Sequence, residues 1–470
     1  MKNIAIILLV FTILSSPFQG KACSTFMIKN ESQHILGHNL DISGKMPGMV
    51  FINKRGIQKR GHTWADLTSI DGGDKSGISW VSSYGSITFN AFGRDLPDGG
   101  MNEKGLFIWE MSGNTTFDKE EKRPRLFMSQ WIQYQLDNHK TLEEVLDNLP
   151  ALGLDGWNWH FFITDQKGEA AAVEFIDGVP IVISGSNMPI PIMGNGRYTD
   201  DQSFLSEFKG FGGDIDIDLD DPNLPGFVKA AKIISECPES IENEKYGFGI
   251  LEQLSGKISK WAIVFDINEK RVYFRTAQHL DVKSFSMETI DFSAQSPVMT
   301  LNIQDSTYQG DVSNKFVEFR IEDNYHLAQE TVKKIYQADE FEISEDTLVK
   351  RLATAYETRG IQITEHIEGQ WAGYAEYPTT GEPATVDWLI NIDMSDGKIS
   401  GKITDSAGLL SETEMRNIVL ENGILQFTVY SYGYVFKIYA KVTDENIEGI
   451  FDISDEYRKG NFRVDLASSN

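Results

Sequence analysis

The sequence predicts a mixed α/β or α+β protein with more than one folded unit, and two observations support this prediction. The chain has 470 residues, of which 41% are hydrophobic and 11% aromatic, whereas a single core rarely grows beyond about 250–300 residues. Along the chain, alternating patterns typical of strands give way to helical spacing and later return to alternation. We therefore expect at least two separate cores.

Strands and helices follow one another in the first 310 residues. Short apolar runs separated by Gly and Asp predict strands over 50–105, and 126–136 has the apolar spacing of a helix. Thr141 begins a capping box, which is typical of a helix start. A new strand pair begins near Trp157, and further helices follow Phe227. This order fits two sheets stacked between helical layers.

The last third of the chain changes pattern twice. Residues 311–360 have helical spacing, and we interpret them as a helical connector. From 361 to 470 the alternation of strands takes over, with Asp-Gly and Asn-Gly at 396–397 and 422–423, which favour hairpin turns. We expect an antiparallel β-meander or small barrel there, and both a ligand-binding role and a stabilising role stay open for it.

Residues 1–22 have the features of a secretory signal peptide. A positively charged start precedes the mostly apolar run 4–14, and the small-x-small tripeptide Gly20-Lys21-Ala22 is typical of a cleavage site. The apolar run is shorter than the about 20 residues that span a bilayer, so we expect removal rather than anchoring. Cleavage between Ala22 and Cys23 predicts an exported protein, periplasmic or secreted, that begins at Cys23.

A cysteine at the first position of a mature chain carries both a thiol and a free α-amine. The amine titrates near about 8 and the thiol near about 8.5, so the amine can accept the thiol proton and generate the attacking thiolate. Two other interpretations stay open. Cys23 can pair with Cys237, the second of two cysteines, in an oxidising compartment, or it can carry a lipid. Lipidation favours Leu three residues before the cysteine, where this chain has Gly20.

The residues after Cys23 predict a hairpin that returns a carboxylate to the cysteine. Residues 23–29 have the pattern of a short strand, a polar turn follows at 30–32, and a second strand leads to Asp41. This segment resembles the choloylglycine hydrolase and penicillin V acylase family, which are linear-amide hydrolases of the N-terminal-nucleophile (Ntn) class. The resemblance implies that Cys23 is the nucleophile and that Asp41 is the carboxylate beside it.

The resemblance continues far beyond this hairpin, through segments in the family's order. The matching segments are 84–87, 100–106, 160–174, 193–195, 227–231 and 271–276. The resemblance implies a four-layer αββα sandwich over 23–310, in which Asn195 donates a hydrogen bond to the developing oxyanion. His160, in the central strand pair, is expected to be packed or to form part of the substrate wall.

Three positions depart from the family's pattern, and they concern substrate binding. His38 stands where the family has an arginine, Gly226 falls where it has a second arginine, and Ser112 falls where it has Asn or Tyr. His38 is expected to be only partly charged near neutral pH. We therefore expect His38, Tyr84 and Ser112 to bind neutral or weakly polar N-acyl amides. Penicillin V, N-acyl homoserine lactones and N-acyl amino acids are expected ahead of taurine conjugates.

Charge and motif content exclude several classes of partner. The formal net charge is −26 and becomes −28 when the leader and its two lysines are removed, so we expect no binding to nucleic acid and no stable membrane insertion. The acidic segment 214–221 lacks EF-hand spacing, because Leu219 and Pro225 stand at the Gly and Glu positions. No His-Glu-x-x-His or Cys-x-x-Cys motif occurs. We expect no metal and no cofactor, and a homo-oligomer stays open.

The function that we expect is hydrolysis of linear amide bonds through a thioester on Cys23, with the Cys23 α-amine as proton acceptor and donor. Two alternatives stay open. One is a dipeptidase of the related N-terminal-cysteine class, whose motif has Arg-Asn where this chain has His38-Asn39. The other is an exported binding lipoprotein in which the C-terminal meander is the functional part.

Overall fold

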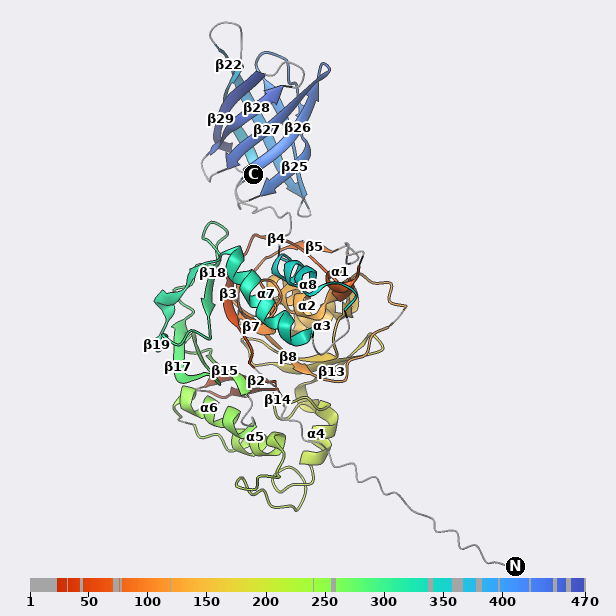
Figure 1. Cartoon of the computed structure of the whole chain (residues 1–470), viewed down its shortest axis with the longest axis vertical. Coiled ribbons are helices and arrows are strands. Elements are labelled where there is room, and N and C mark those ends of the chain that lie inside the picture. Colours follow the sequence, from red (N-terminus) through yellow and green to blue (C-terminus); the bar gives the residue numbers. More distant parts are fainter. Residues whose placement is uncertain are drawn as a thin grey trace, which may run out of the picture.

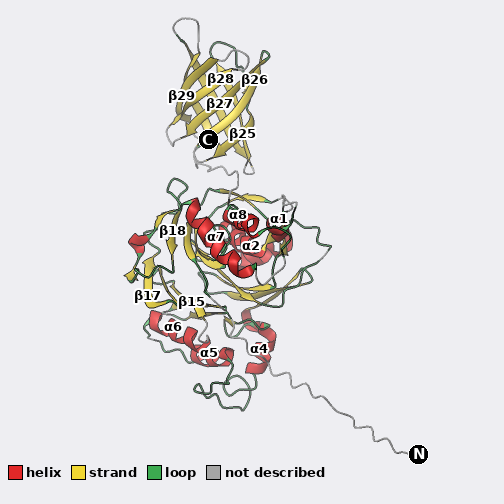
Figure 2. Cartoon of the chain, in the orientation of Figure 1, coloured by secondary structure: helices red, strands yellow, loops and turns green. Residues whose placement is uncertain are grey.

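The computed structural model describes residues 23–468 except 32, 43–44, 71–75, 77, 119, 240, 255–258, 337–340, 357–366, 378–382, 396–397, 422–423, 443–445 and 454–457. The leader and the two predicted C-terminal hairpin turns therefore lie outside the described residues. The fold belongs to the α+β class, as predicted, with most strands in three large sheets (Figures 1 and 2). Two of these sheets stack face to face with helices outside them, and the third is C-terminal.

The seven-stranded sheet contains the strand that follows Cys23. Across the sheet its strands are β14 (Ile192–Met193), β1 (Ser24–Lys29), β2 (His34–Asp41), β15 (Ser259–Asp266), β16 (Arg271–Thr276), β17 (His279–Ser286) and β19 (Gly310–Asp311). All neighbours are antiparallel except β17 and β19. Its outer face packs Phe26 and Ile35 against Val228 and Phe248 of the covering helices. Those helices are α4 (Tyr198–Leu205), α5 (Gly226–Ser235) and α6 (Asn243–Leu254).

The nine-stranded sheet of the sandwich is antiparallel throughout. Across the sheet its strands are β13 (Val179–Ser184), β12 (Ala170–Ile176), β11 (Trp159–Thr164), β8 (Phe107–Ser112), β7 (Gly99–Asn102), β6 (Ser86–Asn90), β3 (Met49–Asn53), β18 (Met299–Asn302) and β20 (Val317–Glu318). Helices α2 (Met128–Asn138) and α3 (Leu142–Asn148) belong to the layer outside it. Trp131 of α2 packs on Phe161 with ring centroids 4.6 Å apart, which fixes this helix on the sheet.

Short elements complete the sandwich. They are β4 (Gln58–Arg60), β5 (Ser79–Val81), α1 (Trp64–Thr68), β9 (Arg125–Phe127), β10 (Gly153–Asp155) and the 3-10 turns Leu149–Ala151, Gly185–Asn187 and Ser313–Lys315. The capping box at Thr63 starts α1, because the Thr63 hydroxyl accepts from the Asp66 N–H while the Asp66 carboxylate accepts from the Thr63 N–H. Thr141 caps α3, where the sequence predicted a helix start.

The helices predicted for 311–360 are present, and they share the core of the sandwich. They are α7 (Ile321–Ile335) and α8 (Glu345–Ala353), and Val332 and Leu348 belong to the same apolar cluster as the two sheets. Thr331 donates to the Ala91 carbonyl. The Arg351 guanidinium donates to the carbonyls of Leu67 and Ser69, at 3.3 and 2.6 Å. These contacts tie the helices to loops of the first hundred residues.

Contacts between the two stacked sheets define the ends of the sandwich. The Thr25 hydroxyl of β1 lies 3.1 Å from the Met111 sulfur of β8. Farther along β1, the Met27 sulfur lies 3.1 Å from the Thr164 hydroxyl of β11, and Thr164 pairs with Phe107 at the other end of β8. Cys23, which precedes β1, therefore lies at the Met111 end of the sandwich.

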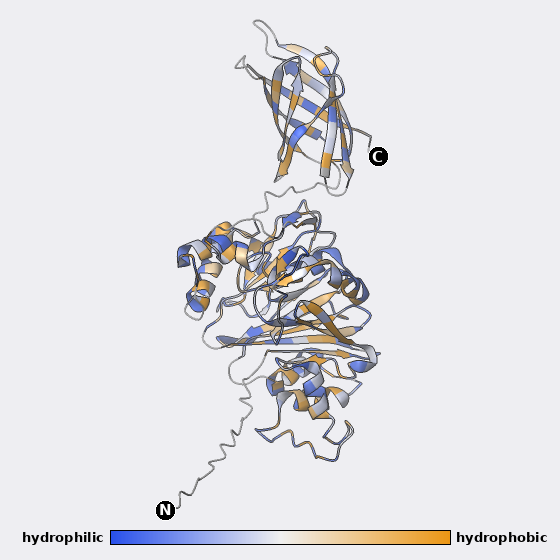
Figure 3. Cartoon of the chain, turned by 90° about the vertical axis from the view of Figure 1, so that its right-hand side faces the viewer, coloured by the Kyte–Doolittle hydropathy of each residue, from blue (hydrophilic) through white to orange (hydrophobic). Residues whose placement is uncertain are grey.

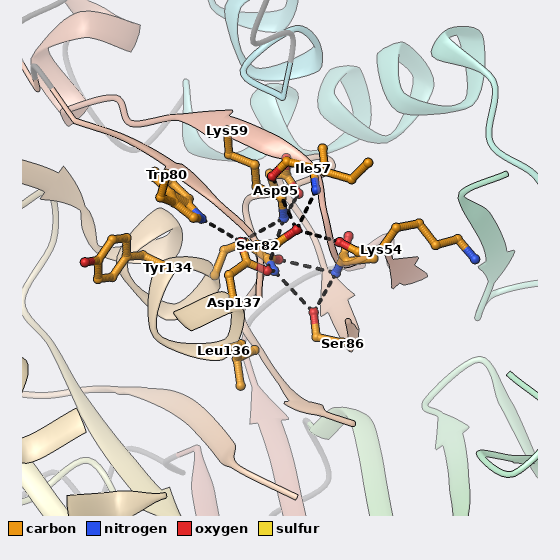
Figure 4. A network of polar contacts seen from close by, with 12 residues as sticks. Lys54, Ile57, Lys59, Trp80, Ser82, Ser86, Asp95, Tyr134, Leu136 and Asp137 are labelled. Atoms are coloured by element: carbon orange, nitrogen blue, oxygen red, sulfur yellow. Dashed lines mark hydrogen bonds and ion pairs between the residues drawn. The ribbon is translucent and has the colours of Figure 1, made fainter. Parts of the chain in front are cut away.

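A buried ionic network joins β4, β5, α2 and the loop before β7 (Figure 4). The Lys59 ammonium lies 2.9 Å from Asp95 and 3.0 Å from Asp137, and all three side chains are buried. The Trp80 indole N–H and the Gln133 amide also donate to Asp137, at 2.8 and 2.9 Å. Burial raises the pKa of Asp137 to about 6, although the Lys59 charge opposes this. Such a network costs desolvation, so losing one member leaves an uncompensated buried charge.

The C-terminal sheet has its own apolar core. Across the sheet its strands are β24 (Thr413–Glu414), β23 (Lys398–Asp405), β22 (Ala384–Ser395), β21 (Gly369–Tyr377), β29 (Arg458–Ser468), β28 (Asn446–Ile453), β27 (Tyr434–Val442), β26 (Ile424–Ser431) and β25 (Arg416–Glu421). Only Met415 separates the two edge strands, so the antiparallel sheet is nearly closed and barrel-like. Apolar and polar residues alternate along its strands (Figure 3), and Trp371 and Trp388 lie in its interior. No described helix has the length and apolar character needed to cross a membrane.

Candidate active site

Cys23 lies where three strands of the seven-stranded sheet end together. In β1, Ser24 pairs with Asn39 of β2 on one side, and Thr25 pairs with Met193 of β14 on the other. Continued by two residues, the second register brings Asn195 opposite Cys23. A Cβ atom on Gly194 would lie 4.0 Å from the Cys23 carbonyl oxygen, which confirms this proximity. The predicted nucleophile and oxyanion donor thus lie side by side.

The Cys23 sulfur is buried against the end of β2. Cys23 is only 4% exposed, and the Asp41 backbone N–H donates to Sγ at 3.4 Å. Burial raises the pKa of the Cys23 thiol well above its usual value, the charge of Glu110 raises it further, and the hydrogen bond from Asp41 lowers it. In this environment the sulfur is a thiol at neutral pH, so its reaction as a nucleophile requires a base.

Asp41 is held by a serine that the sequence did not indicate. The Ser259 hydroxyl, at the start of β15, donates to Oδ1 of Asp41, and the two residues are paired across the strands. Asp41 is buried, with 8% of its surface exposed. Ser259 lies more than 200 positions away in a stretch without a motif, so only the strand register identifies it. This bond fixes the Asp41 carboxylate, whose charge also raises the pKa of Cys23.

Asn195 follows β14 and carries an unsatisfied amide oxygen. Its Oδ1 is buried and has no hydrogen-bond partner among the residues that the structure describes. An unsatisfied buried amide costs free energy, and such groups occur where a ligand or water completes the site. The placement of Asn195 beside Cys23 is compatible with the predicted role of its side chain as a donor.

His38 lies inside the sandwich, where its ring packs against Trp109. The two rings are stacked with centroids 4.4 Å apart, and Nδ1 lies 2.8 Å from the Thr25 hydroxyl. His38 has no exposed surface. Burial lowers its pKa well below the usual value, so the ring is neutral at neutral pH rather than partly charged. His38 is therefore a core residue that pairs with Thr25, two positions after Cys23, and its burial does not favour the predicted contact with substrate.

The other two predicted substrate contacts lie at opposite ends of the sandwich. Ser112 is exposed at the end of β8, next to Met111 and therefore at the Cys23 end. Tyr84 lies beside Lys104, whose ammonium is 5.9 Å from the tyrosine ring. Tyr84 precedes β6 and Lys104 follows β7, at the ends of these strands where Ser86 pairs with Asn102. Tyr84 therefore lies at the end of the sandwich far from Cys23, because the strand after it runs toward the Cys23 end.

Two buried carboxyl groups near Cys23 were not predicted. Glu110 of β8 and Asp98 are neighbours, with the Glu110 N–H donating to the Asp98 carbonyl at 3.1 Å, and both are buried. Burial raises the pKa of Asp98 to about 7 and that of Glu110 well above its usual value. A glutamate within the apolar strand 107–111 was the available signal in the sequence. When either group is ionised, its negative charge raises the pKa of the Cys23 thiol.

Aromatic side chains gather at the same end, outside the nine-stranded sheet. Trp159, at the start of β11, pairs with Ser112, and Trp157 packs on it with centroids 5.3 Å apart. Trp64 lies 4.8 Å from Trp157, and Phe341 from the α7–α8 loop lies 6.2 Å from Trp64. A hollow of about 490 Å³ is lined by Trp64, Trp157 and Phe341. Ala65, Thr68, Ser69 and Glu342 complete its walls, which are therefore partly aromatic and partly polar.

The disulfide interpretation of Cys23 is wrong. Both cysteines are free thiols, and the Cys237 sulfur lies 3.6 Å from the Gln33 side chain. Gln33 precedes β2 and so lies near its start, whereas Cys23 lies near its end. Within the described residues, no group of three or more His, Cys, Asp or Glu side chains could hold a metal ion.

Comparison with known proteins agrees with the family resemblance found in the sequence. Residues 23–235 match the model of the linear amide C–N hydrolases, choloylglycine hydrolase family. Penicillin V acylase from Pectobacterium atrosepticum is 24% identical over 323 residues, covering 55% of this chain and 85% of that protein. The family match begins at Cys23 itself.

The fold of the sandwich also occurs in a solved structure. Penicillin V acylase from Agrobacterium tumefaciens superimposes with a TM-score of 0.54 at 21% identity, covering 63% of this chain and 98% of that one. A variant of the conjugated bile acid hydrolase from Clostridium perfringens gives a TM-score of 0.49 at 15% identity, covering 61% of this chain and 98% of that one. The Agrobacterium structure supports the αββα Ntn-type sandwich.

Proposed function

Because the chain belongs, through its N-terminal sandwich, to the linear amide C–N hydrolases of the choloylglycine hydrolase family, we propose that it is exported and hydrolyses N-acyl amides with Cys23 as its first residue. The strongest support is the meeting of three strand ends, which brings Cys23 between Asp41 and Asn195. A buried thiol with a raised pKa needs a base beside it. The α-amine exposed by cleavage after Ala22 supplies that base on the same residue.

The reaction proceeds in two halves. The α-amine accepts the thiol proton, Sγ bonds to the acyl carbon, and the C–N bond breaks as the same proton passes to the leaving nitrogen. Water then attacks the thioester and gives a proton to the α-amine, the S–C bond breaks, and that proton returns to the sulfur. Asp41, held by Ser259, supports the ammonium form of the amine. The Asn195 amide donates to the oxyanion of both tetrahedral intermediates.

The substrate class that we propose is a neutral or weakly polar N-acyl amide. His38 is buried and neutral, so it provides no permanent positive charge for an anionic conjugate. A Cβ on Gly226 would lie 3.1 Å from the Leu254 carbonyl, which leaves little room for a long cationic side chain. We rank penicillin V, N-acyl homoserine lactones and N-acyl amino acids before taurine conjugates.

The experiment is a substrate panel on the exported protein, with its N-terminus sequenced and its intact mass measured. We expect Cys23 at the N-terminus, turnover of penicillin V, and loss of turnover in Cys23→Ser. Cys237→Ser is the matched control and should keep turnover. A diacylglyceryl mass on Cys23 would favour the lipoprotein alternative, and cleavage of dipeptides alone would favour the dipeptidase. Taurine conjugates cleaved fastest would overturn the ranking of substrates.

A further inference from the structure

His160 and Glu174 lie beneath the segment that carries Asn195. His160 is on β11 and Glu174 is on β12, and both are buried, with 0% and 4% of their surfaces exposed. The His160 ring lies 2.9 Å from the Gly194 carbonyl through Nε2. Gly194 follows β14, which belongs to the other sheet. This hydrogen bond therefore joins the nine-stranded sheet to the residue before Asn195.

The partners of His160 determine where its proton lies. A carbonyl oxygen only accepts, so Nε2 carries a hydrogen and donates it to Gly194. The opposite nitrogen, Nδ1, faces the Glu174 carboxylate at 3.6 Å. Glu174 also accepts from the Tyr198 N–H at 3.4 Å and lies 3.7 Å from the Arg197 guanidinium. Glu174 thus lies beside the ring, without a hydrogen bond to Nδ1, and holds the residues that follow Asn195.

The ring has no freedom to leave this position. A Cβ on Gly113 would lie 2.6 Å from Cγ of His160, so the Gly113 backbone packs directly on the imidazole. Gly113 is itself fixed by hydrogen bonds with Asn158, whose side-chain amide donates to the Gly113 carbonyl at 2.6 Å. On the far side, the Tyr198 hydroxyl donates to the Ile190 carbonyl at 2.9 Å. The segment 190–198 is therefore anchored before and after Asn195.

We propose that His160 and Glu174 are positioning residues that hold the Gly194–Asn195 segment opposite Cys23, so that the Asn195 amide reaches the oxyanion. This inference rests on the proposed function. The pair touches neither sulfur nor substrate, and it acts through the backbone of Gly194. Its contribution lies in the transition state rather than in substrate binding, since the oxyanion develops only during the reaction.

The test is a double-mutant cycle between His160 and Asn195. His160→Phe fills the ring's space and removes the donor to Gly194. We expect its kcat to fall about 10- to 100-fold with little change in KM, since a misplacement of about 1 Å can cost on the order of 100-fold. His160→Gln keeps an N–H donor and should recover part of this loss. In an Asn195→Ala background, His160→Phe should cost less than about twofold further, because the group it positions is gone.

Controls separate a positioning role from a general effect on folding. His34→Phe removes another buried histidine from β2 at the end far from Cys23, and it should leave kcat near wild type. Glu174→Gln keeps the side-chain volume and should lower kcat without lowering substrate affinity, which tests the same segment if His160→Phe does not fold. Additive losses from His160→Phe and Asn195→Ala would overturn the inference. An Asn195→Ala enzyme with wild-type kcat would instead overturn the oxyanion role in the proposed function.

Discussion

The sandwich and the C-terminal sheet have opposite kinds of interior. The sandwich buries many charged or ionisable side chains, among them Lys59, Asp137, His38 and Glu110. In the C-terminal sheet, Asp405 is the one buried charged side chain within the part of the chain that the structure describes. Buried polar groups cost free energy unless they are paired, and they are retained where chemistry needs them. The sandwich therefore holds the buried ionisable groups near Cys23, whereas the described interior of the C-terminal sheet is almost entirely apolar.

The largest effect should come from a change that leaves both interiors intact. A protein made with Met retained before Cys23 should fold normally and yet lose turnover by on the order of 10⁴-fold, comparable to removing a nucleophile. The reason is that an amide nitrogen cannot accept the thiol proton, whereas an α-amine can. Removal of the Met should restore the rate, with mass spectrometry confirming each N-terminus. Full activity in a chain proven to retain the extra residue would contradict the mechanism.

Breaking one buried polar contact in the sandwich and one in the C-terminal sheet compares the two interiors directly. Lys59→Met leaves Asp95 and Asp137 buried without their cation, and it should lower the free energy of unfolding by about 3–5 kcal/mol. In the C-terminal sheet, Tyr377→Phe removes a 3.1 Å bond to Asp405 and should cost about 1–2 kcal/mol. In urea unfolding, Lys59→Met should lower only the midpoint of the sandwich transition, and Tyr377→Phe only that of the C-terminal sheet. A shift of both transitions together would mean that the two cores unfold as one.

Acid should weaken the sandwich through His38. Burial holds the pKa of His38 in the folded protein well below 6.5, so the unfolded chain binds its proton at a higher pH. The stability from the neutral ring is complete above 6.5 and is lost as the pH falls, by up to about 2 kcal/mol between 6.5 and 5. His38→Phe keeps the stack on Trp109 and should show a weaker loss over this range. Equal pH dependence of the variant and the wild type, measured by thermal unfolding, would contradict this prediction.

Removal of the C-terminal sheet should have the smallest effect. A fragment containing residues 23–360 keeps both sandwich sheets with α7 and α8, whose Val332 and Leu348 belong to the sandwich core. Its kcat and KM should stay within about twofold of the full chain, since that is the usual tolerance for independent parts. The steady-state rate and the thermal unfolding of the fragment are the measurements. A folded fragment that binds substrate and does not turn it over would assign part of the active site to the C-terminal sheet.

The parts of the site that were predicted are those that the chain brings together locally. Asp41 returns to Cys23 through a single hairpin, and Asn195 matched a family segment. The position of Tyr84 at the end far from Cys23 was not predictable, because a motif indicates a strand but not which of its ends lies near the site. His38 was assigned to the substrate because a polar residue in a strand has two possible faces, and only packing against Trp109 distinguishes them.

Long-range pairs were beyond prediction for a different reason. Ser259 and Asp41 become neighbours only when β15 pairs with β2, and Asp98 and Glu110 only through the register of β7 and β8. The α+β class and the barrel-like C-terminal sheet were predictable because alternation and helical spacing are local. The docking of α8 on the first hundred residues was not, because the amphipathic face of a helix indicates burial without naming the partner.

The contacts of Arg351 also bear on how the chain folds during synthesis. Its guanidinium donates to the carbonyls of Leu67 and Ser69, more than 280 positions earlier. Contacts so distant in sequence form late because a long loop must close first. Most strands of the C-terminal sheet pair with sequence neighbours, which favours rapid, independent folding. A nascent chain that has not yet extended past α8 therefore exposes apolar surface in the sandwich. Such exposed apolar surface favours aggregation until α8 has docked.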